Sequence, residues 1–478
     1  MTETLHSFVA GRWTSATDAY EIRSPATGAL LALAQRATSA DVDRAANAAA
    51  DAARARRHTP LADRVAWCVA VAERIEARTA DLARELAEEH GKTLAEATAE
   101  VQAGARGFRL AAAEAERLDG SIPPVADPHK RVSVIRQPLG AWAIVTPWNF
   151  PFNIPIEYLG PAVATASAFV WKPAPTTSRI AVRLCALMLE AGVPEDLVNL
   201  VLTDEVDVAA GLVTHPAIAA VGLTGGSATG RAVAQAAWDK HLLLELGGNG
   251  PVIVLDDADL ERAIPAVAAS AFANAGQVCS AAGRVLAAEG IAGELVAGLA
   301  EAAAGIVVGP PEDQRATMGP VHVEAVAATM DRHVADAAGS GADVVTGGAR
   351  LEGRPTSLYY APTVLDRVAP GALLDREETF GPLAAVVRHR DDEALLAAAN
   401  SSSTGLVAAV FTSSLRRAHW FAERLESGSV VVNDTSNYWE LHLPFGGWAG
   451  KESGRGRLGG RHTLEQFTQL KTISFDVR

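Results

Sequence analysis

The sequence predicts an α/β protein of two or three domains built on parallel β-sheets. Its 478 residues are more than one ordinary hydrophobic core organises. From about residue 139 onward, short apolar runs alternate with segments of helical periodicity. Because a strand, a helix and a second strand in that order form a crossover unit, this alternation indicates parallel sheets covered by helices.

The first part of the chain is predicted to be helical. Residues 38–118 are rich in alanine, and their apolar positions recur at intervals of three and four with charges between them. That spacing is typical of amphipathic helices. Residues 131–146 then read as two strands on either side of a Pro-Leu-Gly turn.

Five apolar runs follow that we interpret as strands, with helices between them. The strands are expected within residues 140–148, 167–174, 197–202, 218–226 and 241–248, and helices over 178–192 and 229–240. A second alternating block runs from residue 251 to about residue 435. The chain ends in a glycine-rich segment and a strand-like one, and it contains no internal repeat or low-complexity linker.

Composition excludes several classes of protein. A net charge of -14 and a pI near 5.4 argue against a general nucleic-acid binder, which needs a basic face. Three cysteines without a CxxC pair fit a reducing cytoplasm. The first residues lack the pattern of a signal peptide, and no apolar run approaches the roughly 18 residues that span a bilayer. No zinc-ligand spacing occurs, so no metal site is expected.

Cys279 differs from the other two cysteines in its surroundings. Cys68 and Cys185 lie in apolar helical patterns, whereas Cys279 lies among small and polar residues in ANAGQVCSAAGR, residues 273–284. A nucleophilic cysteine reacts as the thiolate, and small neighbours leave room for a substrate carbon to approach. The alternative is an inert packed thiol, which the polar setting disfavours.

Two further segments carry groups that suit acyl chemistry. Glu245 ends a hydrophobic strand before Gly-Gly, where burial would raise its pKa and make it a general base; a salt-bridging carboxylate is the alternative. Asn149, in TPWNFP (residues 146–151), can donate an amide N–H to a developing oxyanion. A proline-rich turn with buried aromatic side chains explains that segment equally well.

Three other segments suit a nucleotide. GLTGGSATGR (residues 222–231) follows a strand and precedes a helix, with Gly225 and Gly230 placed to bring backbone near a phosphate, although it lacks the GxGxxG spacing. Lys172, at a strand end, can bind a cofactor hydroxyl or be a surface lysine. Glu378, in EETFGP (residues 377–382), can bind a sugar or cap a loop.

Together and in this order, the motifs TPWNFP, WKPA, LTGGSATG, LELGG, GQVCSAAGR, EETFGP and PFGG resemble those of the aldehyde dehydrogenase superfamily. The resemblance runs from FVAGRW at residue 8 to EQFTQLKTIS at residue 474. It implies a Rossmann-like NAD(P)-binding domain of residues 1–118 and 139–246 and an α/β catalytic domain of residues 247–438. A substrate-tunnel loop would span residues 439–459, and a β-arm for oligomerisation residues 119–138 and 460–478.

The resemblance also implies roles for individual residues. Cys279 would attack the aldehyde carbon, Asn149 and the Cys279 backbone N–H would hold the oxyanion, and after hydride transfer Glu245 would activate the water that hydrolyses the thioester. Lys172 would bind the adenosine ribose and Glu378 the nicotinamide ribose. The implied cofactor-binding residues are Thr146, Trp148, Lys172, Gly225, Gly226, Ser227, Gly230, Leu246, Glu378 and Phe380.

The sequence departs from the family pattern in four places. Pro175 replaces the glutamate that excludes a 2′-phosphate, which leaves NADP open beside NAD. Gly226 replaces the usual serine of the cofactor loop, with Ser227 next to it. Leu458 gives GRL, similar to the benzaldehyde and vanillin dehydrogenase branch. GKESG (residues 450–454) carries extra residues after PFGGW.

Substrate and partners are less constrained. Family geometry implies that Asn153, Glu157, Tyr158, Tyr438, Trp439 and Glu440 line the aldehyde tunnel. These carboxylates and aromatic rings can cage a cation, bind hydroxyls or form ion pairs outside the tunnel, and no arginine for a carboxylated substrate is evident. We expect a polar or aromatic aldehyde and a homodimer or homotetramer.

Three alternatives to that reading remain. A CoA-acylating dehydrogenase is disfavoured because such members commonly lack the glutamate that is present here as Glu245. A cofactor-independent cysteine hydrolase or acyltransferase would need a histidine base, and none of the 12 histidines lies in an evident partner motif. A catalytically idle relative is disfavoured because Cys279, Glu245 and Asn149 are all retained.

Overall fold

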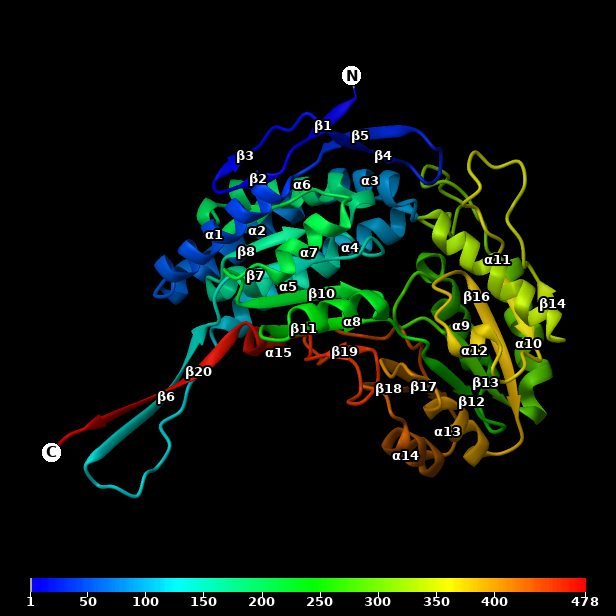
Figure 1. Cartoon of the computed structure of the whole chain (residues 1–478). Coiled ribbons are helices and arrows are strands. Elements are labelled where there is room, and N and C mark those ends of the chain that lie inside the picture. The colour runs from blue at the N-terminus through cyan, green and yellow to red at the C-terminus, as the bar shows by residue number, and fades with distance from the viewer. Residues whose placement is uncertain (1) are drawn as a thin grey trace.

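The computed structural model describes residues 2–478. It has two bodies, each built on a sheet of mainly parallel strands, and a two-stranded arm that extends from the first body (Figure 1). This architecture confirms the predicted α/β class.

The first body contains an eight-stranded sheet in the order β19-β11-β10-β7-β8-β9-β2-β3. Its central strands, from β11 to β9, are parallel and buried. The five strands predicted between residues 140 and 248 are these central strands. The bounds are β2 (Phe8–Val9), β3 (Arg12–Trp13), β7 (Trp142–Val145), β8 (Phe169–Lys172), β9 (Val198–Leu200), β10 (Ala220–Gly225), β11 (His241–Leu246) and β19 (Gly454–Arg455).

Helices cover both faces of this sheet, and the predicted helical region of residues 38–118 is confirmed (Figure 1). Thr38 and Thr93 begin two of its helices with capping boxes, because each accepts a backbone N–H and is paired with an acidic side chain three residues later. The helices are α1 (Ser39–Ala55), α2 (Leu61–Ala77), α3 (Thr79–His90), α4 (Leu94–Ala115), α5 (Asn153–Thr165), η1 (Pro175–Thr177), α6 (Ser178–Glu190), η2 (Glu195–Leu197), α7 (Val206–Thr214), α8 (Ser227–Ala236) and α15 (Gly460–Gln466). A small outer sheet adds β1 (Glu3–Leu5), β4 (Ala19–Arg23) and β5 (Leu30–Gln35).

The second body holds a seven-stranded sheet in the order β14-β15-β16-β13-β12-β17-β18, parallel except for the edge strand β14. Its strands are β12 (Pro251–Val254), β13 (Arg284–Ala288), β14 (Asp343–Thr346), β15 (Thr363–Asp366), β16 (Leu383–His389), β17 (Val407–Phe411) and β18 (Ser429–Val432). Its helices are α9 (Leu260–Phe272), η3 (Ala273–Gly276), α10 (Glu289–Ala304), α11 (Glu324–Gly339), α12 (Leu373–Arg376), α13 (Asp392–Asn400) and α14 (Leu415–Arg424).

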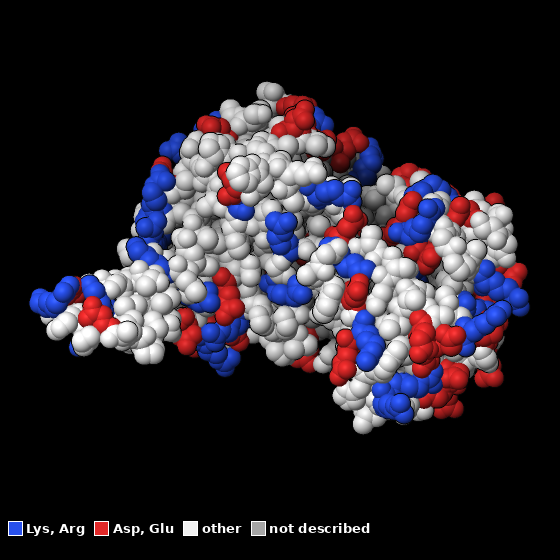
Figure 2. All heavy atoms as spheres, turned by 60° about the horizontal axis from the view of Figure 1, so that its bottom comes forward, with Lys and Arg blue, Asp and Glu red and all other residues white. Residues whose placement is uncertain are grey.

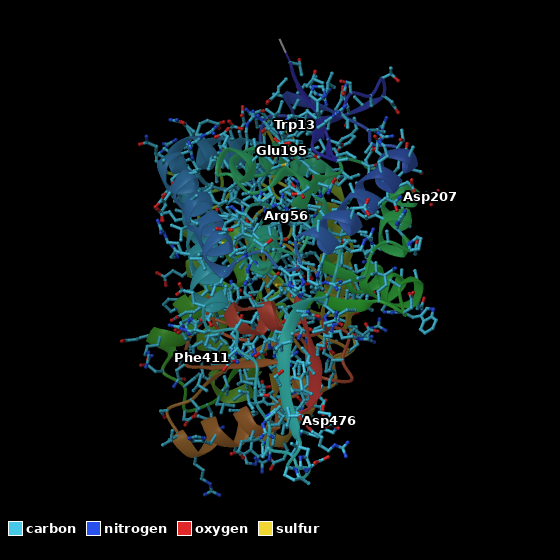
Figure 3. All side chains as sticks on the ribbon, turned by 90° about the vertical axis from the view of Figure 1, so that its left-hand side faces the viewer. Trp13, Arg56, Glu195, Asp207, Phe411 and Asp476 are labelled. Carbon is cyan, nitrogen blue, oxygen red and sulfur yellow. The ribbon has the colours of Figure 1, made fainter. Side chains whose placement is uncertain are left out.

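The arm consists of β6 (Lys130–Pro138) and β20 (Thr468–Asp476), paired antiparallel along their whole length. Asp476 lies near its tip, where Lys130 Nζ donates to its carboxylate at 2.8 Å (Figure 3). Leu470 and Phe475 are 63% and 60% exposed on β20. The two strands therefore carry apolar side chains that this chain itself does not cover.

Each body has its own hydrophobic core. One contains buried side chains from Leu5 to Leu246 together with Leu458, Leu464 and Phe467, and the other contains Ala26 and side chains from Val252 to Leu425. Cys68 and Cys185 are fully buried in the first core, as their helical patterns predict, and burial raises the pKa of both thiols. On the surface, basic and acidic side chains are interspersed (Figure 2).

Candidate active site

The candidate site lies at the carboxyl ends of neighbouring parallel strands in the first body. β7 runs into the Thr146–Pro151 loop, β10 ends at Gly225, and Glu245 is the penultimate residue of β11. Because β7, β10 and β11 are adjacent and parallel, their ends meet at one edge of the sheet. In open α/β sheets this edge is where ligands bind.

Cys279 reaches this edge from the second body through a sharply turned segment. Asn274 and Ala275 have positive φ values of 51° and 54°, which non-glycine residues rarely adopt. Gly276 follows at φ 71°, and a Cβ there would lie 2.1 Å from the carbonyl oxygen of Gly381. The loop before Cys279 is therefore fixed by close packing and by backbone strain of the kind found at functional sites.

Cys279 and Glu245 lie next to each other. Both side chains line the same cavities, and Glu245 Oε1 has no hydrogen-bond partner among the described residues. Burial raises the pKa of Glu245 to about 8, and burial together with the nearby Glu245 charge raises the pKa of the Cys279 thiol. A carboxyl with a pKa near neutrality beside a thiol is the arrangement that acid–base catalysis requires.

Asn149 is held beside the cysteine loop. Its Nδ2 donates to the carbonyl oxygen of Gln277 at 3.0 Å, two residues before Cys279. A primary amide carries two N–H donors, so one remains for an oxyanion formed at Cys279. The backbone carbonyl of Asn149 accepts hydrogen bonds from Lys92 Nζ and Asn274 Nδ2, both at 3.0 Å.

A buried ion pair between Lys92 and Glu100 holds the Asn149 loop in place. Lys92 Nζ lies 2.5 Å from Glu100 Oε2, and the two side chains are only 1% and 2% exposed. Glu100 Oε1 also accepts the backbone N–H groups of Phe152 and Asn153, where α5 begins. Sequence reasoning missed this pair, because nothing in the local pattern of residues 92–100 indicates a contact with a loop more than 45 residues away.

One cavity of about 610 Å³ extends from Cys279 along the strand ends. Six predicted cofactor residues line it, together with other residues of the site; the lining is Pro147, Trp148, Asn149, Thr224, Gly225, Gly226, Glu245, Leu246, Gly247, Cys279, Glu378 and Phe380. A Cβ at Gly226 would meet no atom within 4 Å, so the space beside this residue is open. The first backbone N–H groups of α8 come directly after Gly226. This geometry fits a pyrophosphate, which helix N-termini bind.

The other four predicted cofactor residues do not line that cavity. The hydroxyl of Thr146 accepts the indole N–H of Trp171 at 2.9 Å inside the core. Lys172 ends β8, and burial lowers its pKa to about 8. Ser227 begins α8, and Gly230 allows that helix to approach Leu246, since a Cβ there would lie 2.3 Å from the leucine methyl groups.

The wall opposite α8 is formed by Glu378, Phe380 and Trp148. Glu378 Oε1 accepts the backbone N–H of Gly248 at 3.1 Å, and burial raises the pKa of its carboxyl to about 8. Phe380 packs edge-to-face on Trp148 with ring centroids 5.6 Å apart. Trp148 in turn stacks on His322 at 4.9 Å, so the aromatic wall is anchored in the second body.

A second cavity, of about 840 Å³, lies on the other side of Cys279 and Glu245. Its lining comes from the start of α5, the cysteine loop and the segment after β18, and comprises Phe150, Asn153, Ile154, Glu157, Thr224, Glu245, Ala273, Val278, Cys279, Ser280, Asn437, Trp439 and Phe445. Cys279 and Glu245 therefore stand where the two cavities meet.

Three of the six predicted tunnel residues are in this second lining, and three are not. Asn153, Glu157 and Trp439 line it. Tyr158 is not in this lining: it is fully buried, with its hydroxyl 2.8 Å from Thr224 Oγ1. Tyr438 and Glu440 are not in it either; they hydrogen-bond to each other at 3.0 Å on the protein surface.

Phe150 and Phe445 are cavity-lining residues that the sequence reasoning did not assign to the tunnel. Both belong to the family motifs TPWNFP and PFGG. The motifs indicate that the two residues lie near the site, but not that their side chains face this cavity. Trp439 and Phe445 pack with ring centroids 5.3 Å apart. The outer part of the cavity is thus aromatic.

Comparison with known proteins identifies the family. The family profile described as aldehyde dehydrogenase matches residues 13–473. The chain belongs to the aldehyde dehydrogenase family. It is 35% identical over 478 residues to glutarate-semialdehyde dehydrogenase of Pseudomonas aeruginosa, covering 98% of this chain and 96% of that one.

A second curated relative and a solved structure extend the comparison. The NADP(+) succinate-semialdehyde dehydrogenase of Escherichia coli is 38% identical over 393 residues, covering 82% of this chain and 80% of that one. Betaine aldehyde dehydrogenase of Staphylococcus aureus, solved in complex with NAD+, superposes with a TM-score of 0.95 at 28% identity, over 99% and 97% of the two chains.

The predicted family, the α/β fold and the reaction class are therefore confirmed: this aldehyde dehydrogenase oxidises an aldehyde to an acid, with NAD or NADP as hydride acceptor. None of its helices over residues 2–478 is long and apolar enough to cross a membrane. Within the same residues, no group of three or more His, Cys, Asp or Glu side chains is arranged to hold a metal ion.

Proposed function

We propose that Cys279, Glu245 and Asn149 carry out this oxidation. The observation that supports the assignment is the position of Cys279 and Glu245 at the junction of the two cavities. A nucleophile at such a junction can meet an aldehyde from one side and a hydride acceptor from the other. The bound nicotinamide cofactor supplies one function, acceptance of the hydride from the carbon attached to Cys279.

The side chains supply the rest of the chemistry. Glu245 takes the thiol proton, and the Cys279 sulfur bonds to the aldehyde carbon, whose oxygen becomes an oxyanion. The free N–H of Asn149 and the backbone N–H of Cys279 hold that oxyanion. After the hydride leaves, the acyl group is a thioester on Cys279. Glu245 releases the thiol proton to solvent and, ionised again, removes a proton from the water that hydrolyses the thioester to the carboxylic acid, with Cys279 leaving as the thiolate.

We propose that the cofactor site accepts both NAD and NADP. Lys172 would bind the adenosine ribose from the end of β8, where burial lowers the pKa of its ammonium group to about 8. Pro175, three residues later, carries no charge that would repel a 2′-phosphate. One relative is described as NADP(+)-dependent and a solved neighbour holds NAD+, which agrees with acceptance of either.

The arm supports a proposal about assembly. Leu470 and Phe475 are exposed on β20, and the two arm strands pair only with each other in the described chain. We propose that the arm pairs with another copy of the chain in a homodimer or homotetramer. Light scattering of the intact protein, compared with a variant lacking residues 468–478, tests this; a monomeric intact protein would refute it.

The central test is nicotinamide reduction, followed at the reduced-cofactor absorbance with NAD+ and with NADP+. Cys279→Ala is expected to abolish the signal while the protein still binds cofactor. Glu245→Gln is expected to give a slower burst, because the thiol lacks its proton acceptor, that still reaches one reduced nicotinamide per site. Steady-state turnover should slow more strongly, because hydrolysis of the thioester lacks its base. Turnover by Cys279→Ala would remove the nucleophile from the scheme. A wild-type signal that requires added CoA would favour the acylating alternative.

A further inference from the structure

The cavity on the aldehyde side of Cys279 is rich in hydrogen-bond acceptors and poor in free donors. Asn153 Nδ2 donates to Glu157 Oε1 at 3.0 Å, and Ser280 Oγ donates to Asn437 Oδ1 at 2.8 Å. The Ser280 hydroxyl and one of the two Asn153 N–H groups are therefore already used within the protein. Thr224, the remaining hydroxyl in the lining, is bonded to the hydroxyl of buried Tyr158.

Acceptor oxygens are left over in the same cavity. Asn153 Oδ1 and Glu245 Oε1 are buried and have no hydrogen-bond partner among residues 2–478. Glu157 Oε2 likewise accepts no hydrogen bond from the described part of the chain. A buried acceptor without a hydrogen-bond partner costs free energy. A ligand with N–H or O–H donors would supply those partners and so bind more tightly.

Charge favours the same kind of ligand. Glu157 and Glu245 both line the cavity, and no Lys, Arg or His of residues 2–478 does. Aromatic rings of Phe150, Trp439 and Phe445 form much of the remaining wall, and such rings attract cations. Burial and the neighbouring Glu245 raise the pKa of Glu157, and burial raises the pKa of Glu245, because neither carboxyl has a cation beside it. A bound ammonium group would favour the ionised form of both carboxyls, whereas a substrate carboxylate would not.

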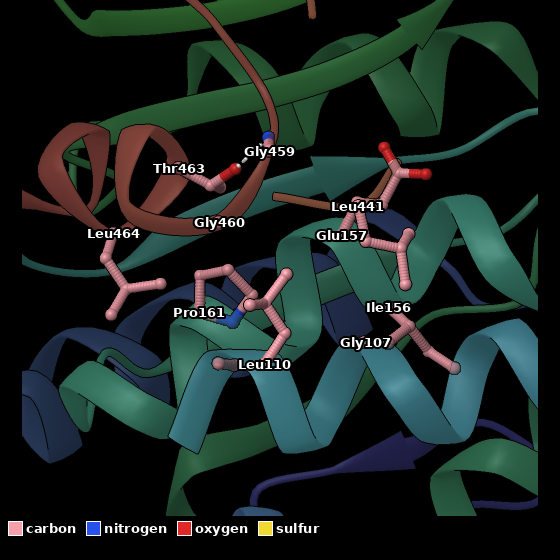
Figure 4. Close-up of a pocket in the computed structure, with 11 residues that line it drawn as sticks. Gly107, Leu110, Ile156, Glu157, Pro161, Leu441, Gly459, Gly460, Thr463 and Leu464 are labelled. Carbon is pink, nitrogen blue, oxygen red and sulfur yellow. Dashed lines mark hydrogen bonds between the residues drawn. The ribbon is translucent and has the colours of Figure 1, made fainter. Parts of the chain in front are cut away.

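Glu157 also borders a second space. It also lines a smaller cavity of about 300 Å³ between α4, α5 and α15, where it lies at the end next to Leu441 (Figure 4). It therefore stands between the tunnel and this side cavity.

We propose that the substrate is an aldehyde bearing an ammonium group, and that Glu157 is the residue that selects for it. This inference rests on the proposed function and adds the substrate class. The ammonium group would be bound by Glu157 and Asn153 Oδ1 against the aromatic wall. The substrates in the names of the semialdehyde dehydrogenase relatives carry a carboxylate, so this chain differs from them in the sign of the charge it selects.

The test uses aldehydes matched in shape. 3-Aminopropanal is compared with butanal, in which a methyl group replaces the ammonium, and 4-oxobutanoate is compared with 4-methylpentanal, in which an isopropyl group replaces the carboxylate. For the wild-type enzyme we expect kcat/KM for 3-aminopropanal to exceed that for butanal by about 10-fold or more, as a charge-assisted hydrogen bond provides. We expect 4-oxobutanoate to be poorer than its isostere.

The variant Glu157→Gln keeps the volume and an oxygen that can accept the Asn153 N–H, but it removes the carboxyl that a bound ammonium group would hold in its ionised form. We expect the ratio of kcat/KM for 3-aminopropanal to that for butanal to fall by about 10- to 100-fold. Glu440→Gln is the matched control. This exposed carboxylate bonds to Tyr438 outside the cavity lining, so its replacement should leave the ratio unchanged. Thermal unfolding of each variant checks that it is folded.

The outcomes are distinguishable. Oxidation of butanal with a preference for 4-oxobutanoate over 4-methylpentanal would overturn the substrate class and leave the proposed function intact. An ammonium preference that persists in Glu157→Gln would remove Glu157 from its role. If no aldehyde in either pair reduced NAD+ or NADP+, the proposed function and this inference would both be wrong.

Discussion

Replacing Lys92 by methionine should destabilise the protein far more than replacing a surface cation. The Lys92–Glu100 pair is 1% and 2% exposed, so the variant leaves a carboxylate buried without its cation. Breaking such a pair costs about 3–5 kcal/mol. Two backbone N–H groups still donate to Glu100 in the variant, so we expect a value near the lower end, about 3 kcal/mol.

A surface pair provides the control. Arg109 and Glu76 form two hydrogen bonds at 2.8 and 2.7 Å, but their side chains are 43% and 47% exposed. Loss of an exposed pair costs about 0.2–1 kcal/mol. For a body of roughly 200 residues these values correspond to a fall in the unfolding midpoint of about 6–12 °C for Lys92→Met and less than about 4 °C for Arg109→Met.

The measurement is thermal unfolding of both variants, combined with the rate of the hydride burst. Lys92 also donates to the carbonyl of Asn149, so we expect the burst to slow by about 10-fold or more in Lys92→Met and not in Arg109→Met. In the double variant Lys92→Met/Glu100→Gln the buried charge is gone, and much of the stability should return. Equal midpoints and equal burst rates for the two single variants would refute the reasoning.

Two further predictions concern the site itself. Because the carboxyl of Glu245 has a pKa of about 8 and acts only when ionised, steady-state turnover should rise as the pH passes from below 8 to above 8, and this dependence should be lost in Glu245→Gln; a wild-type rate that falls over that range would contradict the base assignment. Gly248→Ala should slow the burst by about 100-fold, because its Cβ would lie 2.2 Å from the carbonyl oxygen of Cys279, whereas Gly293→Ala, which meets nothing within 4 Å, should leave the burst rate unchanged; equal burst rates in the two variants would show that the cysteine loop tolerates displacement.

The strands and the chemical groups at their ends were predictable because their signals are local. An apolar run that ends in glycine or proline identifies β7, β10 and β11 without knowledge of any partner. Since parallel strands end at one edge, Asn149, Gly225 and Glu245 could be expected together. The family motifs then placed Cys279 beside them.

The lining of the aldehyde cavity was predicted only in part, for two physical reasons. α5 is buried on nearly all sides, so no polar face shows that Glu157 points into the cavity and Tyr158 away from it. The segment from Tyr438 to Phe445 has no helix or strand period, so its orientation is decided by tertiary contacts. The contact of the Lys92–Glu100 pair with the Asn149 loop depends on α4 packing against the start of α5. No short-range sequence pattern indicates that packing.

The meeting of two cavities at Cys279 has a consequence for how inhibitors would behave. A small molecule lodged against Trp439 and a nucleotide lodged against Phe380 lie on opposite sides of the nucleophile and touch separate walls. Each could reside without evicting the other, so compounds aimed at the aldehyde side should retain their potency at high nucleotide concentration. A reduced nucleotide could likewise leave its own cavity while the acyl group stays on sulfur. The two-cavity arrangement therefore allows the reduced cofactor to be released before the acid.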